Sequence, residues 1–360
     1  MRKSMDRTGR GAVCALAALA LSAALTSASA TPPAGETSRI PFAERFHATG
    51  HGGFARAAHS LVTCRPAERA GRPSCAAARR SGRDAGPRTA YLDVDDDPRT
   101  VGSSRAALRM PAGSRVRYAR LYWGGDLPVD GRRTARGERE MLLAGPRDRY
   151  REVRADGPIG RRTTARTDAY QASADVTALV RRSGAGTYTV ARPRRARERA
   201  RAGAWGGWAL IVAYENPREP LRRLALWDGF EALGGHRRAL AVEMAGLRIP
   251  AHARGRAGIV AYHGAPGDGG KISARAGRTT PVALRDSAEP GNAATHSARQ
   301  NFGRKTPGAP VYRAPAGFDS GLFDLTPALR SGGDRLVFRF TTRKAGYLLG
   351  AFFVQADLRR

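Results

Sequence analysis

The alternation of apolar and polar residues along the chain predicts a succession of short β-strands. Residues 115–123 alternate between two faces, which is typical of a half-buried strand. Every position from Trp208 to Tyr214 is apolar, as in a central strand covered on both faces. Residues 336–340 alternate again, and turns rich in Gly, Pro and Asp separate these segments. The pattern favours an all-β fold built from sandwiches or jelly rolls.

The same order of motifs occurs twice in the chain. The motif DVTALV, which begins at Asp175, recurs as DLTPAL from Asp324, and GWALIVAYE from Gly207 recurs as GYLLGAFFV from Gly346. Such self-similarity is typical of a repeated structural unit. We therefore predict two jelly-roll-like β-sandwiches arising from an internal duplication.

The N-terminal residues have the pattern of a secretory signal peptide. Basic residues precede an apolar run from Ala12 to Leu25, and Ala28-Ser29-Ala30 is an A-x-A cleavage site. No later stretch reaches the ~20 apolar residues of a transmembrane helix. We predict a secreted, extracellular protein, with cell-wall association as one option and no membrane span in the mature chain.

The domain organisation follows from the leader and the repeat. We predict a signal peptide over residues 1–30, a linker over 31–39, and two β-sandwich domains over 40–231 and 232–360.

Two cysteines, Cys64 and Cys75, remain once the leader is removed. In an oxidising compartment a close pair predicts a disulfide. Closing a loop of about a dozen residues stabilises a fold by ~3 kcal/mol. A metal-binding pair would require the tighter C-x-x-C spacing of zinc sites.

The chain is strongly basic, with 62 Lys and Arg against 31 Asp and Glu and a net charge of +31. Such a charge favours adhesion to anionic surfaces, although a bias of the whole composition towards Ala, Gly and Arg would produce it too. Nucleic acid is not the partner that we expect, because no helix-turn-helix, zinc finger or aromatic RNA-binding motif is present.

The repeated Asp-x-Thr motif is interpreted as a turn. The carboxylates of Asp175 and Asp324 are placed to accept hydrogen bonds from backbone N–H groups just ahead, before glycines end each turn. The motif resembles the DVT…L…G corner of galactose-binding-like jelly-roll modules attached to glycosidases, where its role is architectural.

Further blocks resemble an uncharacterised family of secreted, actinobacterial-type surface proteins. They are DVDDD from Asp93, SSRAAL from Ser103, LYWGG from Leu121 and LALWDGF from Leu224, besides ADVTALV and GWALIVAYE. The chain departs from the family at Asp96, where a glycine is usual. The resemblance implies export and a β-rich fold, and it carries no established activity.

Asp93, Asp95 and Asp97 are candidate ligands for Ca²⁺, because alternate carboxylates of an extended segment project to one side. The EF-hand pattern fails here, since Pro98 replaces its glycine and Ser104 its glutamate. The alternative is an acidic strand end neutralised by neighbouring arginines. No other cofactor is predicted.

Catalytic constellations are not evident in the sequence. A G-x-S-x-G elbow is missing, and His47 and His51 have no acidic residue between them. Four carboxylates at strand ends are candidates for glycoside hydrolysis or for structural ion pairs with arginine. They are Glu215, Asp228, Glu231 and Glu243.

Aromatic residues in loops are candidates for ligand binding. Trp205 lies among glycines beside a basic loop, and the Gly/Pro/Asn-rich segment 286–317 contains Asn301, Phe302 and Tyr312. Trp123 and Trp208, by contrast, are expected in the sandwich cores.

Together these features predict a non-catalytic secreted protein that binds or scaffolds at the cell envelope. Its expected partner is a cell-wall polymer, a glycan or a surface protein. The alternative function is that of a carbohydrate-binding module or a carbohydrate-active enzyme.

The leader prediction fixes where the mature chain begins. We expect N-terminal sequencing of the exported protein to start near Thr31, because signal peptidase cleaves after the A-x-A site. Export of a chain that still carries residues 1–30 would contradict this prediction.

Overall fold

The computed structural model describes most of the chain from Glu36 onwards. The described residues are 36–64, 89–127, 138–163, 168–193, 205–262, 271–284, 300–301, 304–305, 308–309, 318–343 and 346–358. Contacts divide the chain into two compact units, Met1–Pro33 and Ala34–Arg360, and every described residue belongs to the second. Among the described residues, no helix combines the length and the apolar character needed to cross a membrane.

An eleven-stranded sheet forms the middle of the second unit, and its neighbouring strands are antiparallel except for the first pair. Its strands, in spatial order, are β1 (Glu36–Thr37), β9 (Ile159–Thr163), β10 (Asp168–Asp175), β6 (Arg115–Leu127), β12 (Trp205–Glu215), β2 (Ile40–Ser60), β13 (Leu221–Leu233), β24 (Tyr347–Asp357), β15 (Gly255–Tyr262) and β21 (Phe318–Asp319), with β22 (Leu322–Asp324) also paired to β15.

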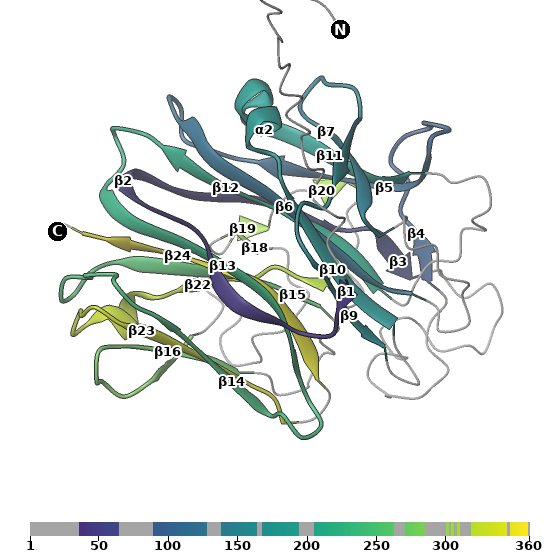
Figure 1. Cartoon of the computed structure of the whole chain (residues 1–360). Helices are drawn as coiled ribbons and strands as arrows, with labels where there is room; N and C mark the ends of the chain where they lie inside the picture. Colours follow the sequence, from purple (N-terminus) through teal and green to yellow (C-terminus); the bar gives the residue numbers. More distant parts are fainter. Residues whose placement is uncertain are drawn as a thin grey trace, which may run out of the picture. The chain divides into compact units, whose positions relative to one another are not determined.

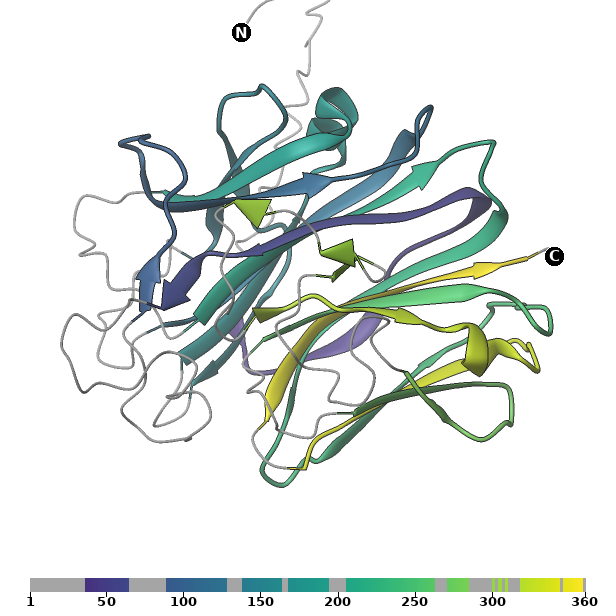
Figure 2. The ribbon, with the colours of Figure 1, turned by 180° about the vertical axis from the view of Figure 1, so that it is seen from behind.

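Two smaller sheets cover the outer faces of the two halves of the large sheet (Figures 1 and 2). The first contains, in order, β20 (Gly308–Ala309), β5 (Thr100–Leu108), β11 (Gly186–Pro193), β7 (Glu140–Ala144) and β8 (Arg151–Arg154). The second contains β14 (Ala239–Met244), β23 (Leu336–Thr341), β16 (Lys271–Ala276) and β17 (Val282–Ala283). Two short hairpins, β3 (Val62–Cys64) with β4 (Thr89–Tyr91) and β18 (Gln300–Asn301) with β19 (Arg304–Lys305), and the helices α2 (Thr177–Ser183) and η1 (Thr326–Leu329) complete the described elements.

The strand order repeats between the two halves of the chain. In the large sheet the order β10-β6-β12-β2 is matched, from the other side, by β22-β15-β24-β13. The covering sheets match in the same way, as β5-β11-β7-β8 and β14-β23-β16-β17. The fold is thus all-β, with two jelly-roll-like sandwiches of equivalent strand order, as the sequence repeat predicts.

The two half-sheets are joined edge to edge by β2 and β13. Residues 52–60 of β2 pair with β12, while residues 40–51 pair with β13, so one long strand belongs to both halves. Figure 1 shows β2, in purple, running between β12 and β13. The predicted domain boundary between residues 231 and 232 falls inside β13. The assignment of the two halves as separate domains stays a prediction, and the sheet itself is continuous across them.

The large sheet folds back on itself along this join. Strands β6 and β15 stand five places apart, which is roughly 24 Å in a flat sheet. A Cβ added to Gly124 of β6 would nevertheless lie only 2.7 Å from the ring of Tyr262 in β15. The half-sheets therefore pack face to face, and a glycine is required where Tyr262 approaches the backbone.

Three apolar cores fill the spaces between the layers. Trp123 and Trp208 are fully buried between the first half-sheet and its covering sheet, which confirms the sequence prediction for both. Phe338 and Phe352 belong to the equivalent core of the second sandwich. The third, which we call the junction core, lies between the half-sheets. Its members include Tyr122, Ile211, Phe230, Val260, Tyr262 and Phe353.

A buried carboxylate, Asp228, stands beside the junction core at an irregularity in β13. The register of β13 shifts on both sides of Asp228, as a β-bulge requires, and such bulges bend a strand. Arg45 of β2 donates two hydrogen bonds to Asp228 at 2.9 Å, and the Tyr122 hydroxyl donates a third at 3.0 Å. The Arg120 Nε lies 3.5 Å from the same carboxylate. Burial raises the pKa of Tyr122 well above its ordinary value, so its hydroxyl stays protonated and donates.

The repeated Asp-x-Thr turn has the same hydrogen bonds in both halves. The backbone N–H of Thr177 donates to Asp175 at 2.8 Å, and that of Thr326 donates to Asp324 at 3.0 Å. Each threonine hydroxyl then accepts a bond from the adjacent strand, from Ala119 N–H at 2.9 Å and from Gly255 N–H at 3.2 Å. Both aspartates therefore form turns, as the sequence interpretation states, and the threonines attach each turn to its sheet.

The hydroxyls of Thr177 and Thr326 should stabilise the fold. Replacing Thr177 or Thr326 by Val keeps the side-chain volume but leaves a strand N–H without its acceptor, which costs about 1–3 kcal/mol of unfolding free energy. Urea unfolding measures this loss. Thr187→Val is the control, because Thr187 is exposed on β11 and the replacement should change stability by less than about 0.5 kcal/mol. Equal stability of all three variants would contradict the role of the hydroxyl.

The ion pairs of Asp228 with Arg45 and Arg120 should also contribute to stability. Asp228→Asn keeps the shape but removes the charge that neutralises Arg45 and the buried Arg120, so we expect a loss of about 3 kcal/mol in urea unfolding. Glu152→Gln breaks an exposed pair with Arg154 and should cost less than about 1 kcal/mol. Similar losses in the two variants would show that burial of Asp228 is not what makes its charge important.

Candidate functional site

Most of the ligand-binding residues predicted from the sequence fall outside what the structure describes. Trp205 opens β12 and Asn301 ends β18, but their side chains lie outside the described residues, as do Phe302 and Tyr312 altogether. The segment 286–317 is described only in β18, β19 and β20. Ligand binding by these residues stays a prediction.

The predicted disulfide also involves residues outside the described part of the chain. Cys64 ends β3, whereas its side chain and the whole of Cys75 lie outside the described residues. The Cys64–Cys75 bridge therefore stays a prediction.

The three aspartates proposed for calcium contact three different partners. Asp93 accepts a hydrogen bond from the Ser103 hydroxyl at 2.9 Å, and Asp95 accepts one from the Tyr150 hydroxyl. Asp97 forms an ion pair with Arg99, which lowers the pKa of its carboxyl to about 2. In the described part of the chain, no group of three or more His, Cys, Asp or Glu residues is placed to hold a metal ion. Calcium binding at Asp93, Asp95 and Asp97 stays a prediction.

The strand-end carboxylates considered for glycoside hydrolysis are all ion-paired with arginine, which agrees with their structural interpretation. The pairs are Glu215 with Arg117, Asp228 with Arg45, Glu231 with Arg39 and Glu243 with Arg335. The two histidines do not converge on one site either. His47 contacts Glu44, whereas the ring of His51 lies 2.8 Å from the Glu219 carbonyl oxygen.

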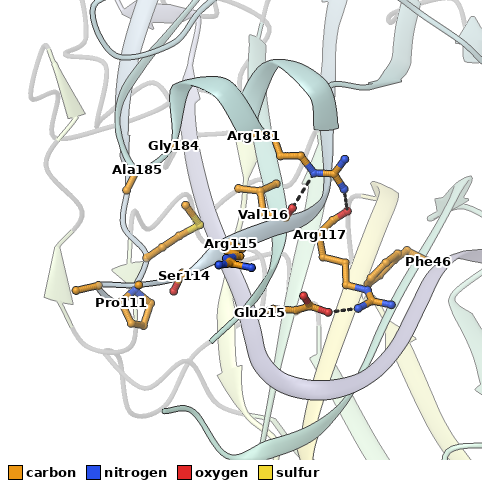
Figure 3. Close-up of a pocket in the computed structure, with 13 residues that line it drawn as sticks. Phe46, Pro111, Ser114, Arg115, Val116, Arg117, Arg181, Gly184, Ala185 and Glu215 are labelled. Carbon is orange, nitrogen blue, oxygen red and sulfur yellow. Dashed lines mark hydrogen bonds and ion pairs between the residues drawn. The ribbon is translucent and has the colours of Figure 1, made fainter. Parts of the chain in front are cut away.

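A groove with a volume of about 880 Å³ lies at one end of the first sandwich. We call it the arginine groove. It lies where the β5–β6 loop, the first residues of β6 and the C-terminal end of α2 meet β2 and the end of β12 (Figure 3). Arg115, Arg117 and Arg181 line it together with Phe46 and Glu215. Met110, Pro111 and Val116 add apolar surface.

Local structure explains why α2 ends at this groove. Strand β10 pairs with β6 only as far as Arg120, so the first residues of β6 have no strand on that side in the described part of the chain. Arg181, in the last turn of α2, donates hydrogen bonds at 3.0 Å to the carbonyl oxygens of Val116 and Arg117 (Figure 3). The guanidinium thus takes the place of a neighbouring strand, and it fixes the helix against the edge of the sheet.

The other two arginines have different surroundings. Arg117 forms an ion pair with Glu215, which stands on the neighbouring strand β12 (Figure 3). Arg115 is exposed, and within the described residues its side chain has no hydrogen-bond or ion-pair partner. Arg115 is therefore the positive charge of this groove that remains available to a ligand.

One aromatic ring, that of Phe46, lines the groove. Phe46 stacks on Tyr118 with ring centroids 4.9 Å apart and planes 6° from parallel. This packing holds the half-buried Phe46 ring in place at the groove. A groove that contains a fixed aromatic ring and an exposed guanidinium suits a ligand with both an apolar face and a negative group, such as an acidic sugar.

The groove is better suited to binding than to acid–base chemistry. Its only carboxylate, Glu215, is neutralised by Arg117, and no histidine or cysteine is among the residues that line it. Ser114 is the one hydroxyl in the lining, and it accepts a hydrogen bond from the Asn216 amide at 3.1 Å. A serine without a neighbouring base is a poor nucleophile.

Of the residues that line the groove, Glu215 alone was a candidate from the sequence, as a strand-end carboxylate. Arg115 and Arg117 are two apart at the start of a strand, so they share a face, and this spacing was a readable signal for a basic strand end. Phe46 and Arg181 come from distant segments, and only the folded chain brings them to the same place.

Comparisons with family models, curated proteins and solved structures do not identify a family for this chain. No family model matches the chain, and no curated protein matches it. A solved structure described as "Crystal Structure of the STIV MCP" aligns over 71% of this chain and 92% of its own, with 10% sequence identity and a TM-score of 0.21. At that TM-score the likeness carries no argument. The resemblance to secreted surface proteins stays a prediction.

Proposed function

We propose that this protein is exported and acts without catalysis at the cell envelope, where it binds or scaffolds a wall polymer or glycan that carries negative charges. The arginine groove is its proposed binding site. The observation that carries the proposal is that one groove holds both the fixed Phe46 ring and the exposed Arg115, whose side chain has no partner among the described residues.

The charge distribution supports a specific site more than a uniform basic coat. Many arginines are used inside the fold, among them Arg45 and Arg120 at Asp228, Arg222 at Glu219 and Asp357, and Arg181 at strand carbonyls. The net charge of +31 therefore overstates what a partner meets. Long-range attraction to an anionic polymer remains, and short-range recognition depends on arginines that are left free.

The alternative is a carbohydrate-binding module or a carbohydrate-active enzyme. An enzyme needs two carboxylates free to act as acid and as base or nucleophile. Here Glu215, Asp228, Glu231 and Glu243 are each held by an arginine, which favours the non-catalytic proposal. A non-catalytic glycan-binding module differs from our proposal only in that its ligand is a neutral glycan.

A retention assay tests the proposal. Purified protein is incubated with cell walls and with insoluble neutral polysaccharides, at low and at high salt, and the bound fraction is measured. We expect cell-wall binding that persists in part at high salt, and about fivefold weaker binding for Arg115→Gln, since an exposed charge contact contributes about 1 kcal/mol.

The matched control is Arg339→Gln, which removes an equally exposed arginine from the outer side of the second covering sheet. It should retain the wild-type affinity at high salt. Equal weakening by the two substitutions, or complete loss of wild-type binding at high salt, would mean that net charge alone causes adhesion. Stronger retention on neutral polysaccharide than on walls would favour the alternative.

A further inference from the structure

A second basic hollow lies in the other sandwich, at the place where η1 faces the turn between β16 and β17. Its volume is about 530 Å³. Arg278 comes from the turn and Arg330 from the end of η1, while Val282, Pro327 and Ala328 supply apolar surface. No carboxylate is among the residues that line it. In this respect it differs from the arginine groove, where Glu215 neutralises one of the cations.

The internal repeat shows why Arg330 is available. In the aligned motifs DVTALVR and DLTPALR, Arg330 occupies the position of Arg181. Arg181 follows a turn of α-helix and binds two carbonyl oxygens of β6. In the second half the helix is a short 3₁₀ segment with Pro327 near its start. Within the described residues the Arg330 side chain has no hydrogen-bond or ion-pair partner, so the structural role of Arg181 is not repeated.

The two segments that form this hollow are hydrogen-bonded to the same carbonyl oxygen, that of Ala276. The Thr279 hydroxyl donates to the carbonyl oxygen of Ala276 at 2.8 Å, and the Ser331 hydroxyl donates to that oxygen at 3.4 Å. Ala276 is buried at the end of β16. The segments that present Arg278 and Arg330 are thus held together before any ligand arrives, which lowers the entropy cost of binding between them.

The donors match a phosphate group. Two guanidinium groups carry two positive charges, which a doubly charged terminal phosphate or two neighbouring, singly charged phosphodiester groups would balance and a single carboxylate would not. The exposed hydroxyl of Thr280, which also lines the hollow, is a further donor for a tetrahedral anion with several acceptor oxygens.

We infer that Arg278, Arg330 and Thr280 form a phosphate-binding site in the second sandwich, separate from the arginine groove and independent of the function proposed for it. Its ligand is a phosphate group of a polyanionic chain or of a lipid headgroup. A chain carrying several phosphates would be bound more tightly than a single phosphate, and the binding would weaken as salt rises.

Calorimetric titration with inorganic tripolyphosphate at physiological salt tests the inference. The probe is titrated into the wild-type protein, into Arg278→Gln/Arg330→Gln and into a charge-matched control, Arg151→Gln/Arg339→Gln. All four arginines are exposed, so both variants should fold, and unfolding temperatures verify this. We expect the first variant to bind one probe fewer per chain, or to bind at least about tenfold more weakly, while the control matches the wild type.

Equal stoichiometry and affinity in the two double variants would overturn the site, because the response would then follow net charge. Arg115→Gln should leave this binding event unchanged, so failure of the groove and failure of the phosphate site are distinguishable. Sedimentation with phosphatidylglycerol vesicles separates the two sources. Vesicle binding that only Arg278→Gln/Arg330→Gln loses assigns a lipid headgroup, and tripolyphosphate binding without vesicle binding assigns a polyanionic chain.

Discussion

The bend of the large sheet at the β2–β13 join is the constraint on which the rest of the structure depends. Packing the half-sheets face to face requires the sheet to bend at this join, and the register shifts around Asp228 are of the kind that bends a strand. A buried carboxylate at a bend is costly unless it is fully paired. Arg45, Tyr122 and Arg120 provide that pairing, and they belong to β2 and β6, the strands that must approach β13. One cluster thereby ties the bend to both half-sheets.

Duplication explains the architecture, and divergence between the copies explains the two candidate sites. The Asp-x-Thr turns kept the same hydrogen bonds, because each attaches its helix to a strand of the large sheet. The residues after the turns have different contacts in the two halves. Arg181 supports the uncovered edge of β6, whereas its counterpart Arg330 faces a hollow. Equivalent positions in a repeat can therefore take different roles once the turn itself is secured.

Arginine has three distinct uses in this molecule. At Asp228 it neutralises a buried carboxylate, and its planar fork makes two parallel hydrogen bonds there. At the edge of β6 it replaces a missing strand by donating to two carbonyl oxygens. At Arg115, Arg278 and Arg330 it is exposed at a hollow. The same residue type thus forms structural contacts at some positions and remains exposed at hollows at others, and composition cannot distinguish them.

The sequence by itself determined the all-β class, the duplication, the burial of Trp123 and Trp208 and the turn role of Asp175 and Asp324. These properties depend on periodicity and on bonds between near neighbours, which a single sequence records. The tertiary structure alone decided that the two sandwiches share one folded-back sheet and that Asp228 is a buried ion-pair partner. It also brought Phe46, Arg115 and Arg181 to one groove. Those outcomes depend on contacts between distant segments, and the spacing of residues along the chain does not encode such contacts.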